Sequence, residues 1–180
     1  MWASVLMATI LGLDLSTRGT AAVAVPVSWD GEWRRVHTLK CGAALHRCSS
    51  DDERAARLAK IASQVVRFAQ VQNVTEAWLE SYAYSRQGAA HTLGELGGVV
   101  RVALAREGIA LHTAQMGTAR KLVLGHVPKG RDIVKALVKA TWASAGFVLG
   151  GIDDDLADAM TCANMGLAEA GGFCFCQAAA

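Results

Sequence analysis

Proline is scarce in this sequence, with two residues among 180, and the five cysteines form no C-x-x-C pair. A chain of this length with 52% hydrophobic residues can bury a core of its own, so a largely disordered protein is excluded. An odd number of cysteines does not suggest a complete disulfide framework, and reduced thiols in a cytosolic protein are the simpler interpretation.

Long hydrophobic runs are also missing. Residues 1–13 are mainly apolar but have no basic segment before them and are too short to cross a membrane, so we expect a buried strand there rather than a signal peptide. The sequence contains no GxSxG elbow, no Walker loop and no HExxH helix. These absences leave no support for the α/β-hydrolase, P-loop and zinc-protease classes that those motifs identify.

The net charge of +2 is too small to indicate a partner, but the basic residues are unevenly distributed. Between residues 119 and 144 the only acid is Asp132, and the basic residues are Arg120, Lys121, Lys129, Arg131, Lys135 and Lys139. Such a cluster suits a polyanion, because each neutralised phosphate releases counterions. The other interpretation is a solvated helix face.

The first third of the chain predicts three antiparallel strands. Residues 8–13 are continuously apolar, which is typical of a central strand covered on both faces. Residues 20–27 predict a second strand, and Asp30-Gly31 is a hairpin signal before a third strand at 33–40.

Helices and buried strands alternate in the rest of the chain. Ser49, Ser50 and the acids Asp51 and Asp52 favour a helix start, and apolar residues at helical spacing extend that helix to about Gln72. We expect strands at 75–79 and 109–113 and helices at 88–106, 118–124, 132–145 and 154–168. The chain is therefore predicted to be a single α/β domain over 1–170, with five strands in a mixed sheet and helices on both faces, followed by a loosely packed tail at 171–180.

Four acids stand out by position. Asp14 and Glu80 follow apolar strands, at the sheet edge where ligands usually bind, and Asp155 and Asp158 share one face of the last helix. Each has a structural alternative, as a turn cap, a surface residue or a helix N-terminal acid. Together, however, such like charges need a cation, and oxygen ligands suit Mg²⁺ or Mn²⁺. Two ions about 4 Å apart could then drive phosphodiester cleavage.

The same segments resemble the RuvC-like Holliday junction resolvases, especially their bacteriophage-type members. The resemblance covers roughly residues 10–167 and implies the ribonuclease H-like fold. The matching motifs are Gly12-Leu13-Asp14-Leu15-Ser16, Leu79-Glu80-Ser81-Tyr82, Arg86-Gln87-Gly88, Thr92-Leu93-Gly94-Glu95-Leu96-Gly97-Gly98 and Asp155-Leu156-Ala157-Asp158-Ala159.

The resemblance implies a homodimer in the cytoplasm of a bacterial cell, cellular or phage-encoded. It would nick opposed strands of a four-way DNA junction symmetrically with Mg²⁺ or Mn²⁺, leaving 5′-phosphate and 3′-hydroxyl ends. Asp14 would bridge two ions, and Glu80, Asp155 and Asp158 would complete their ligand shells. Asp153 and Asp154 stay open as alternatives to Asp155, which is chosen for its spacing to Asp158.

The resemblance also suggests DNA contacts. The expected DNA-binding residues are Tyr82, Tyr84, Arg86, Gln87, Arg120, Lys121, Lys129 and Arg131. The two tyrosines could stack on unpaired bases or be ordinary packing residues. The glycine-rich helix at 88–106 is a candidate dimer interface, although Gly94, Gly97 and Gly98 could equally serve packing within one subunit.

Two other functions remain open. The segment from Asp14 to Thr20 also resembles the phosphate-binding turn of sugar kinases with the actin-like fold, but those proteins contain a duplicated domain and this chain has room for one copy. The other alternative is a protein that binds branched DNA without cutting it. Flaps, forks and Y-junctions share the flexible branch point of a four-way junction, so a broader substrate range is a third open question.

Overall fold

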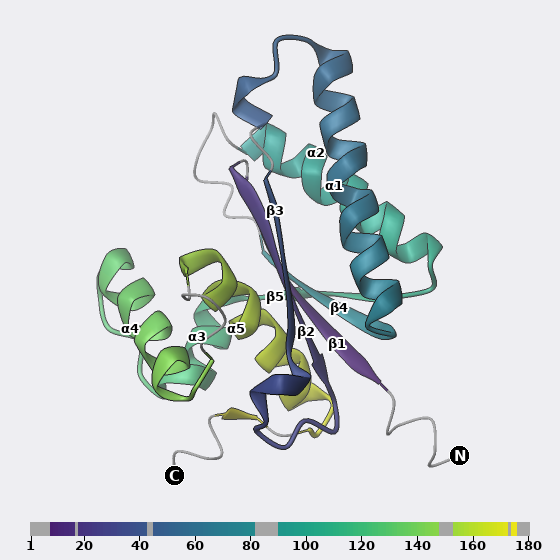
Figure 1. Ribbon diagram of the computed structural model, residues 1–180. Coiled ribbons are helices and arrows are strands. Elements are labelled where there is room, and N and C mark those ends of the chain that lie inside the picture. Colours follow the sequence, from purple (N-terminus) through teal and green to yellow (C-terminus); the bar gives the residue numbers. More distant parts are fainter. Residues whose placement is uncertain are drawn as a thin grey trace.

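The computed structural model of this chain describes residues 8–16, 18–42, 45–81, 90–147, 153–172 and 174–175. Its centre is a five-stranded mixed sheet with the strand order β3-β2-β1-β4-β5 (Figure 1). The antiparallel part contains β1 (Thr9–Leu15), β2 (Gly19–Pro26) and β3 (His37–Gly42). Two strands continue the sheet in parallel with β1, namely β4 (Val74–Glu80) and β5 (Ala110–Ala114). The predicted fold class, with its first three strands antiparallel, is confirmed.

Helices cover both faces of the sheet (Figure 1). One face carries α1 (Asp51–Val71) and α2 (Ala90–Arg106). The other carries α3 (Met116–Leu124), α4 (Arg131–Ser144) and α5 (Asp154–Glu169). All seven residues of β1 are buried, which explains why that strand shows no alternation of polar and apolar residues.

The start of α1 follows its local signal. The Ser50 hydroxyl accepts a hydrogen bond from the Glu53 backbone N–H at 3.1 Å, and the Glu53 carboxylate accepts one from the Ser49 N–H at 2.8 Å. These reciprocal bonds satisfy backbone donors that a helix leaves unpaired at its first turn, so the predicted start is confirmed.

The predicted third strand begins too early, and the two-residue hairpin at Asp30-Gly31 is wrong. The segment between β2 and β3 instead contains a short 3₁₀ helix, η2 (Trp33–Arg35). The reason is tertiary packing, because the Trp33 ring lies against Trp142 and Phe147 and its Nε1 donates to the Ala145 carbonyl. A second 3₁₀ helix, η3 (Leu45–Arg47), leads towards α1.

A glycine on β1 allows α5 to approach the sheet very closely. A Cβ atom added at Gly12 would lie 2.0 Å from the Ala159 carbonyl oxygen and 2.5 Å from the Ala163 nitrogen. No side chain fits there, so the backbone of α5 lies directly on the central strand. This contact positions the acids of α5 relative to those of the sheet.

The segment after α5 is better packed than expected. Cys174 is 1% exposed, and the Phe175 backbone N–H donates to the Asn164 side-chain oxygen at 3.0 Å. The Phe175 ring also contacts Trp142. A loosely packed tail is therefore wrong for these two residues, because a buried asparagine of α5 binds this segment.

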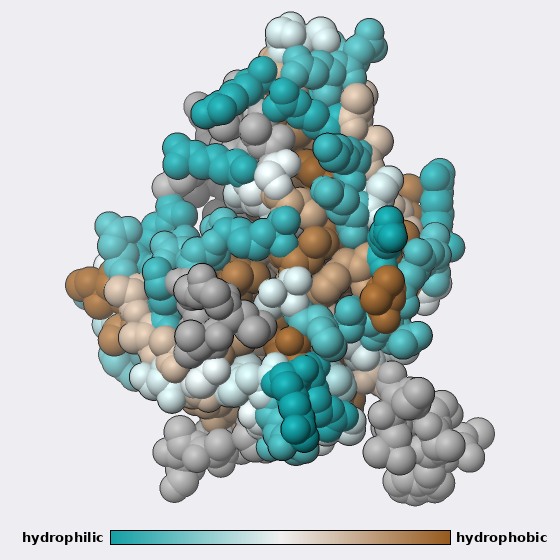
Figure 2. Space-filling model, in the orientation of Figure 1, coloured by the Kyte–Doolittle hydropathy of each residue, from teal (hydrophilic) through white to brown (hydrophobic). Residues whose placement is uncertain are grey.

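The face seen in Figure 2 is largely hydrophilic, with apolar surface at the edge over α4, where Ile133 and Leu137 are 56% and 43% exposed. None of the helices in the described ranges is both long and apolar enough to be a membrane span.

Candidate active site

Asp14 and Glu80 lie side by side on parallel strands. Leu13 of β1 is paired with Leu79 of β4, so the two acids are the next residues along both strands. Alternation along β1 places Asp14 on the same face as Gly12, which is the face covered by α5. Both carboxyl groups therefore point from the carboxyl edge of the parallel strands towards α5.

Asp14 is 6% exposed, and its pKa is raised from the usual 3.8 to about 8, with burial as the largest cause. The negative charges of Glu80, Asp158 and Asp155, in that order, contribute to this rise. A hydrogen bond that Asp14 donates to Glu80 also favours its protonated form. Asp14 thus experiences the charges of all three other acids.

Glu80 has a raised pKa as well, first because it is partly buried and then because Asp158 is near. Three effects oppose this shift, namely the hydrogen bond from Asp14 and the positive charges of Arg120 and Lys135. The two adjacent carboxyl groups therefore titrate as a pair, and the hydrogen bond between them favours the protonated form of Asp14.

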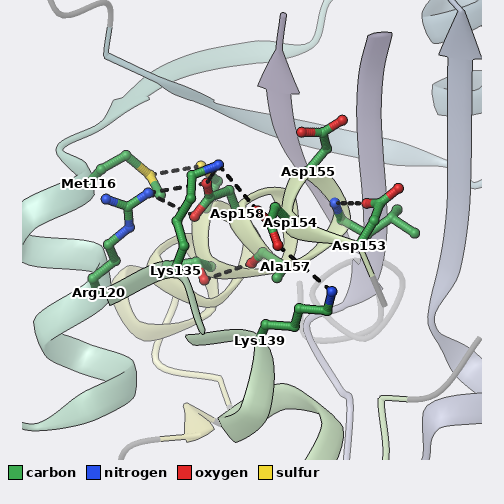
Figure 3. Close-up of polar contacts among 12 residues, drawn as sticks. Met116, Arg120, Lys135, Lys139, Asp153, Asp154, Asp155, Ala157 and Asp158 are labelled. Carbon is green, nitrogen blue, oxygen red and sulfur yellow. Dashed lines mark hydrogen bonds and ion pairs between the residues drawn. The ribbon is translucent and has the colours of Figure 1, made fainter. Parts of the chain in front are cut away.

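Asp158 extends from α5 and is 4% exposed. Nη2 of Arg120 on α3 donates to both carboxylate oxygens, at 2.9 and 3.1 Å (Figure 3). Nζ of Lys135 on α4 lies 3.6 Å from Oδ2. Two helices therefore contribute the positive charges that balance this buried carboxylate.

The three consecutive acids at the start of α5 have different surroundings (Figure 3). Asp153 caps the helix by accepting from the Leu156 N–H at 2.9 Å, and it also pairs with Lys40. Asp154 lies 3.8 Å from Nζ of Lys139 and 3.9 Å from that of Lys135, on the side of α4. Only Asp155, of these three, is among the charges that raise the pKa of Asp14.

Two residues of the site were not anticipated. Lys40 on β3 occupies the same row of the sheet as Asp14, through the pairs Asp14–Ala21 and Ala21–Lys40, and its Nζ is 3.9 Å from Asp155. Cys162, four residues after Asp158 on α5, is fully buried, and burial together with the charges of Glu80, Asp14 and Asp158 raises the pKa of its thiol. Alternation along β3 could have indicated Lys40, but no sequence signal identified Cys162.

The expected DNA-binding residues divide into three groups. Lys121, Lys129 and Arg131 are exposed around α3 and the start of α4. Arg120 is turned inward to Asp158, with a side chain 17% exposed. The others, Tyr82, Tyr84, Arg86 and Gln87, lie outside the described residues.

The donor set fits a hard divalent cation, because the pKa values of Asp14 and Glu80 on two adjacent strands are raised by burial and by the negative charge of Asp158 on α5. As they stand, no three His, Cys, Asp or Glu side chains in the described ranges are close enough to one another to hold an ion. The Asp158 carboxylate is instead paired with Arg120. The predicted ligand set of Asp14, Glu80, Asp155 and Asp158 stays a prediction.

Two solved structures from Thermus thermophilus resemble this chain over most of its length. A RuvC structure superimposes with a TM-score of 0.66 at 20% sequence identity, covering 91% of this chain and 97% of that one. A RuvC in complex with Holliday junction substrate gives a TM-score of 0.65 at 19% identity, covering 87% and 90%. This chain has the RuvC fold. No protein-family model and no curated protein matches the sequence itself.

The RuvC fold accounts for the arrangement of the sheet and α5, and the predicted ribonuclease H-like architecture agrees with it. At 19–20% identity the likeness concerns the fold, so the roles of individual residues have to come from their own surroundings.

Proposed function

We propose that this chain is a metal-dependent, structure-selective endodeoxyribonuclease that resolves Holliday junctions by paired symmetric nicks. The observation that carries the proposal is the convergence of Glu80, Asp155 and Asp158 on the buried Asp14. The RuvC fold supports it, since one of the similar structures is a RuvC with a Holliday junction substrate.

Asp14, Glu80, Asp155 and Asp158 would hold two Mg²⁺ or Mn²⁺ ions. Bound ions would supply the charge that aligns a water and stabilises the leaving oxygen of a phosphodiester. Asp14 and Asp158 are 6% and 4% exposed, so their charges act in a medium of low polarity. Asp14 must release its proton before it can act as a ligand, because its pKa is about 8.

Lys121, Lys129 and Arg131 would bind DNA phosphates. Lys121 on α3, Lys129 in the loop between α3 and α4, and Arg131 at the start of α4 are exposed. The same two helices supply Arg120 and Lys135 to the acids, so this basic surface borders the site. Phosphate contacts of this kind position the duplex but do not read its sequence. Tyr82 and Tyr84 follow Glu80 closely in the chain, and we assign them to the branch point, where stacking on a base contributes about 1–3 kcal/mol.

We also propose a homodimer, with the exposed face of α2 as its interface. Val99 and Val102 are 37% and 53% exposed on α2. A Cβ atom added at Gly94 or Gly98 would meet nothing within 4 Å, so packing within the described part of one subunit does not explain these two glycines. A twofold axis would direct two equal sites to opposed strands, as symmetric nicking requires.

The test is a panel of end-labelled substrates with Mn²⁺, comprising a four-way junction, a fork, a flap, a Y-junction and linear duplex. Wild type is expected to nick the four-way junction at paired symmetric positions and to leave the duplex intact. Asp14→Asn should abolish nicking and retain junction binding, because asparagine has nearly the size of the protonated Asp14. A ligase should reseal the nicks directly, since the ends carry 5′-phosphate and 3′-hydroxyl groups.

The outcomes separate the alternatives. Intact junctions after hours with wild type and Mn²⁺ would leave only a binding protein. Equal cleavage of forks, flaps and four-way junctions would replace strict resolution by general debranching. ATP-dependent phosphorylation of a polyol would support the sugar kinase, although the described part of the chain contains one sheet of five strands and not a duplicated domain.

A further inference from the structure

Arg120 and Asp158 form a buried ion pair at the centre of the site. Asp158 is 4% exposed, and the side chain of Arg120 is 17% exposed. A carboxylate in such a position is costly unless a positive charge and hydrogen bonds compensate it. Both of its oxygens accept from the same nitrogen, Nη2 of Arg120, so this one side chain supplies most of the compensation.

The guanidinium is anchored mainly through Asp158. Its Nε atom is buried and has no hydrogen-bond partner in the described structure. An arginine with several hydrogen-bond partners would be fixed in place. If Arg120 turns outward, its Nε atom reaches water and is no longer buried without a partner, which lowers the cost of the movement. Its attachment to Asp158 is therefore exchangeable.

A divalent cation at the acids would meet Arg120 as a competitor. Both need the oxygens of Asp158, and a positive guanidinium within hydrogen-bonding distance of that carboxylate repels a second cation nearby. Lys135 acts in the same direction but more weakly, because its Nζ is 3.6 Å from Oδ2.

We propose that Arg120 is the resident counter-ion of Asp158 and thereby sets the affinity of this site for divalent metal. With a divalent ion held by the acids, Arg120 would leave Asp158 and turn towards the basic surface formed by Lys121, Lys129 and Arg131. Arg120 is then a positioning residue in the metal-free protein and a phosphate contact after exchange. This inference rests on the proposed metal-dependent function.

Isothermal titration of the full chain with Mn²⁺ tests the proposal. Arg120→Gln removes the competing charge and should tighten Mn²⁺ binding about tenfold, the scale on which one neighbouring charge shifts a carboxyl equilibrium. Arg120→Lys keeps the charge and should stay near wild type. Lys139→Gln is the matched control, because among the described residues Lys139 pairs only with the half-exposed Asp154. The affinity of this variant for Mn²⁺ should change less than about twofold.

A second readout is thermal. Metal-free Arg120→Gln should melt several degrees below wild type, because Asp158 is left buried without its partner, and Mn²⁺ should raise its melting temperature more than it raises that of wild type. If Arg120→Gln does not fold without metal, Lys135→Gln carries the test. It affects the same carboxylate and should also bind Mn²⁺ more tightly than wild type.

Equal or weaker Mn²⁺ binding by both the Arg120→Gln and Lys135→Gln proteins would overturn the inference, because it would mean that these cations support the ligands and do not compete for them. Failure of wild type to bind Mn²⁺ at all would instead refute the metal-dependent function on which the inference rests. The two failures are distinct, since the first requires a wild-type protein that binds metal.

Discussion

Gly12 on β1 and Ala159 on α5 lie so close that a Cβ atom at Gly12 would be 2.0 Å from the Ala159 carbonyl oxygen. Asp14 is two residues after Gly12 on the same face of the strand, and Asp158 directly precedes Ala159 in the helix. The separation of these two acids is therefore determined by a contact between backbones, which is stiffer than a contact between side chains.

The first prediction concerns this contact. Gly12→Ala should lower the free energy of unfolding by about 3 kcal/mol or more, because α5 must move away from β1 to make room. The same movement separates Asp158 from Asp14, so Mn²⁺ binding and cleavage should be lost together. Urea denaturation followed by tryptophan fluorescence measures the first effect, and metal titration of the folded fraction measures the second.

Gly117→Ala is the control for this substitution. Gly117 lies in α3, where an added Cβ would meet nothing within 4 Å, and alanine in a helix stabilises by about 0.5–1 kcal/mol relative to glycine. A Gly12→Ala protein as stable and active as wild type would show that α5 can shift without cost to the site.

The second prediction is a pH dependence of stability. The pKa of Asp14 is raised to about 8 in the folded protein, against 3.8 for an ordinary aspartate, so the folded state binds the extra proton. This contribution is complete below about pH 4 and is lost as the pH rises towards 8. Metal-free wild type should therefore lose up to about 1.4 kcal/mol per pH unit relative to Asp14→Asn across that range. The free energy of unfolding of both proteins is measured by denaturation between pH 4 and 8. The same change with pH in both proteins would contradict the prediction.

The third prediction follows from the same proton. Metal must displace it, so the affinity for Mn²⁺ should rise up to about tenfold per pH unit and level off above about pH 8, where Asp14 is already ionised. Calorimetry in buffers of different ionisation enthalpy counts the protons released. An affinity that does not vary between pH 6 and 8 would exclude Asp14 as a ligand.

Elements with local causes were predictable from the sequence. The Ser50 cap and its acids are adjacent in the chain, and the buried strand β1 is a continuous apolar run, so both were found within a few residues. The placement of Asp14 and Glu80 on adjacent strands also followed, because parallel strands bring their carboxyl ends to one edge.

Features caused by distant contacts were missed. Trp33 was assigned to a strand by its neighbours, but its ring is held by Ala145 and Phe147, more than a hundred residues away. Arg120 was expected to face DNA because it lies in a basic cluster, and its pairing with Asp158, 38 residues further on, depends on how α3 packs against α5. Spacing along one helix does not reveal which charge lies opposite on another.

The fourth prediction concerns which of the three acids at the start of α5 is a metal ligand. Asp155→Asn should lose cleavage at least about a hundredfold, because Asp155 is the one of the three whose charge reaches Asp14. Asp154→Asn should stay active, since Asp154 faces the lysines of α4. Asp153→Ala should cost about 1 kcal/mol of stability through loss of the cap. Cleavage rates on a four-way junction and denaturation curves of the three variants decide the assignment. An Asp154→Asn protein that is inactive but as stable as wild type would indicate that Asp154 is the ligand.

The last prediction concerns the dimer. Val102 is 53% exposed on α2 and follows Gly94 and Gly98 at intervals of four residues, so the three form one stripe along the helix. If two copies of α2 meet along this stripe, a charge at position 102 would be buried without a partner. Val102→Glu should convert a dimer into a monomer by light scattering at micromolar concentration. It should also convert paired nicks into single ones, while Mn²⁺ affinity stays within about twofold, because α2 covers the opposite face of the sheet from α5. Val71→Glu is the matched control, since Val71 is 66% exposed at the end of α1 and lies outside the stripe. A monomeric wild type that still makes paired symmetric nicks would refute both the interface and the need for twofold symmetry.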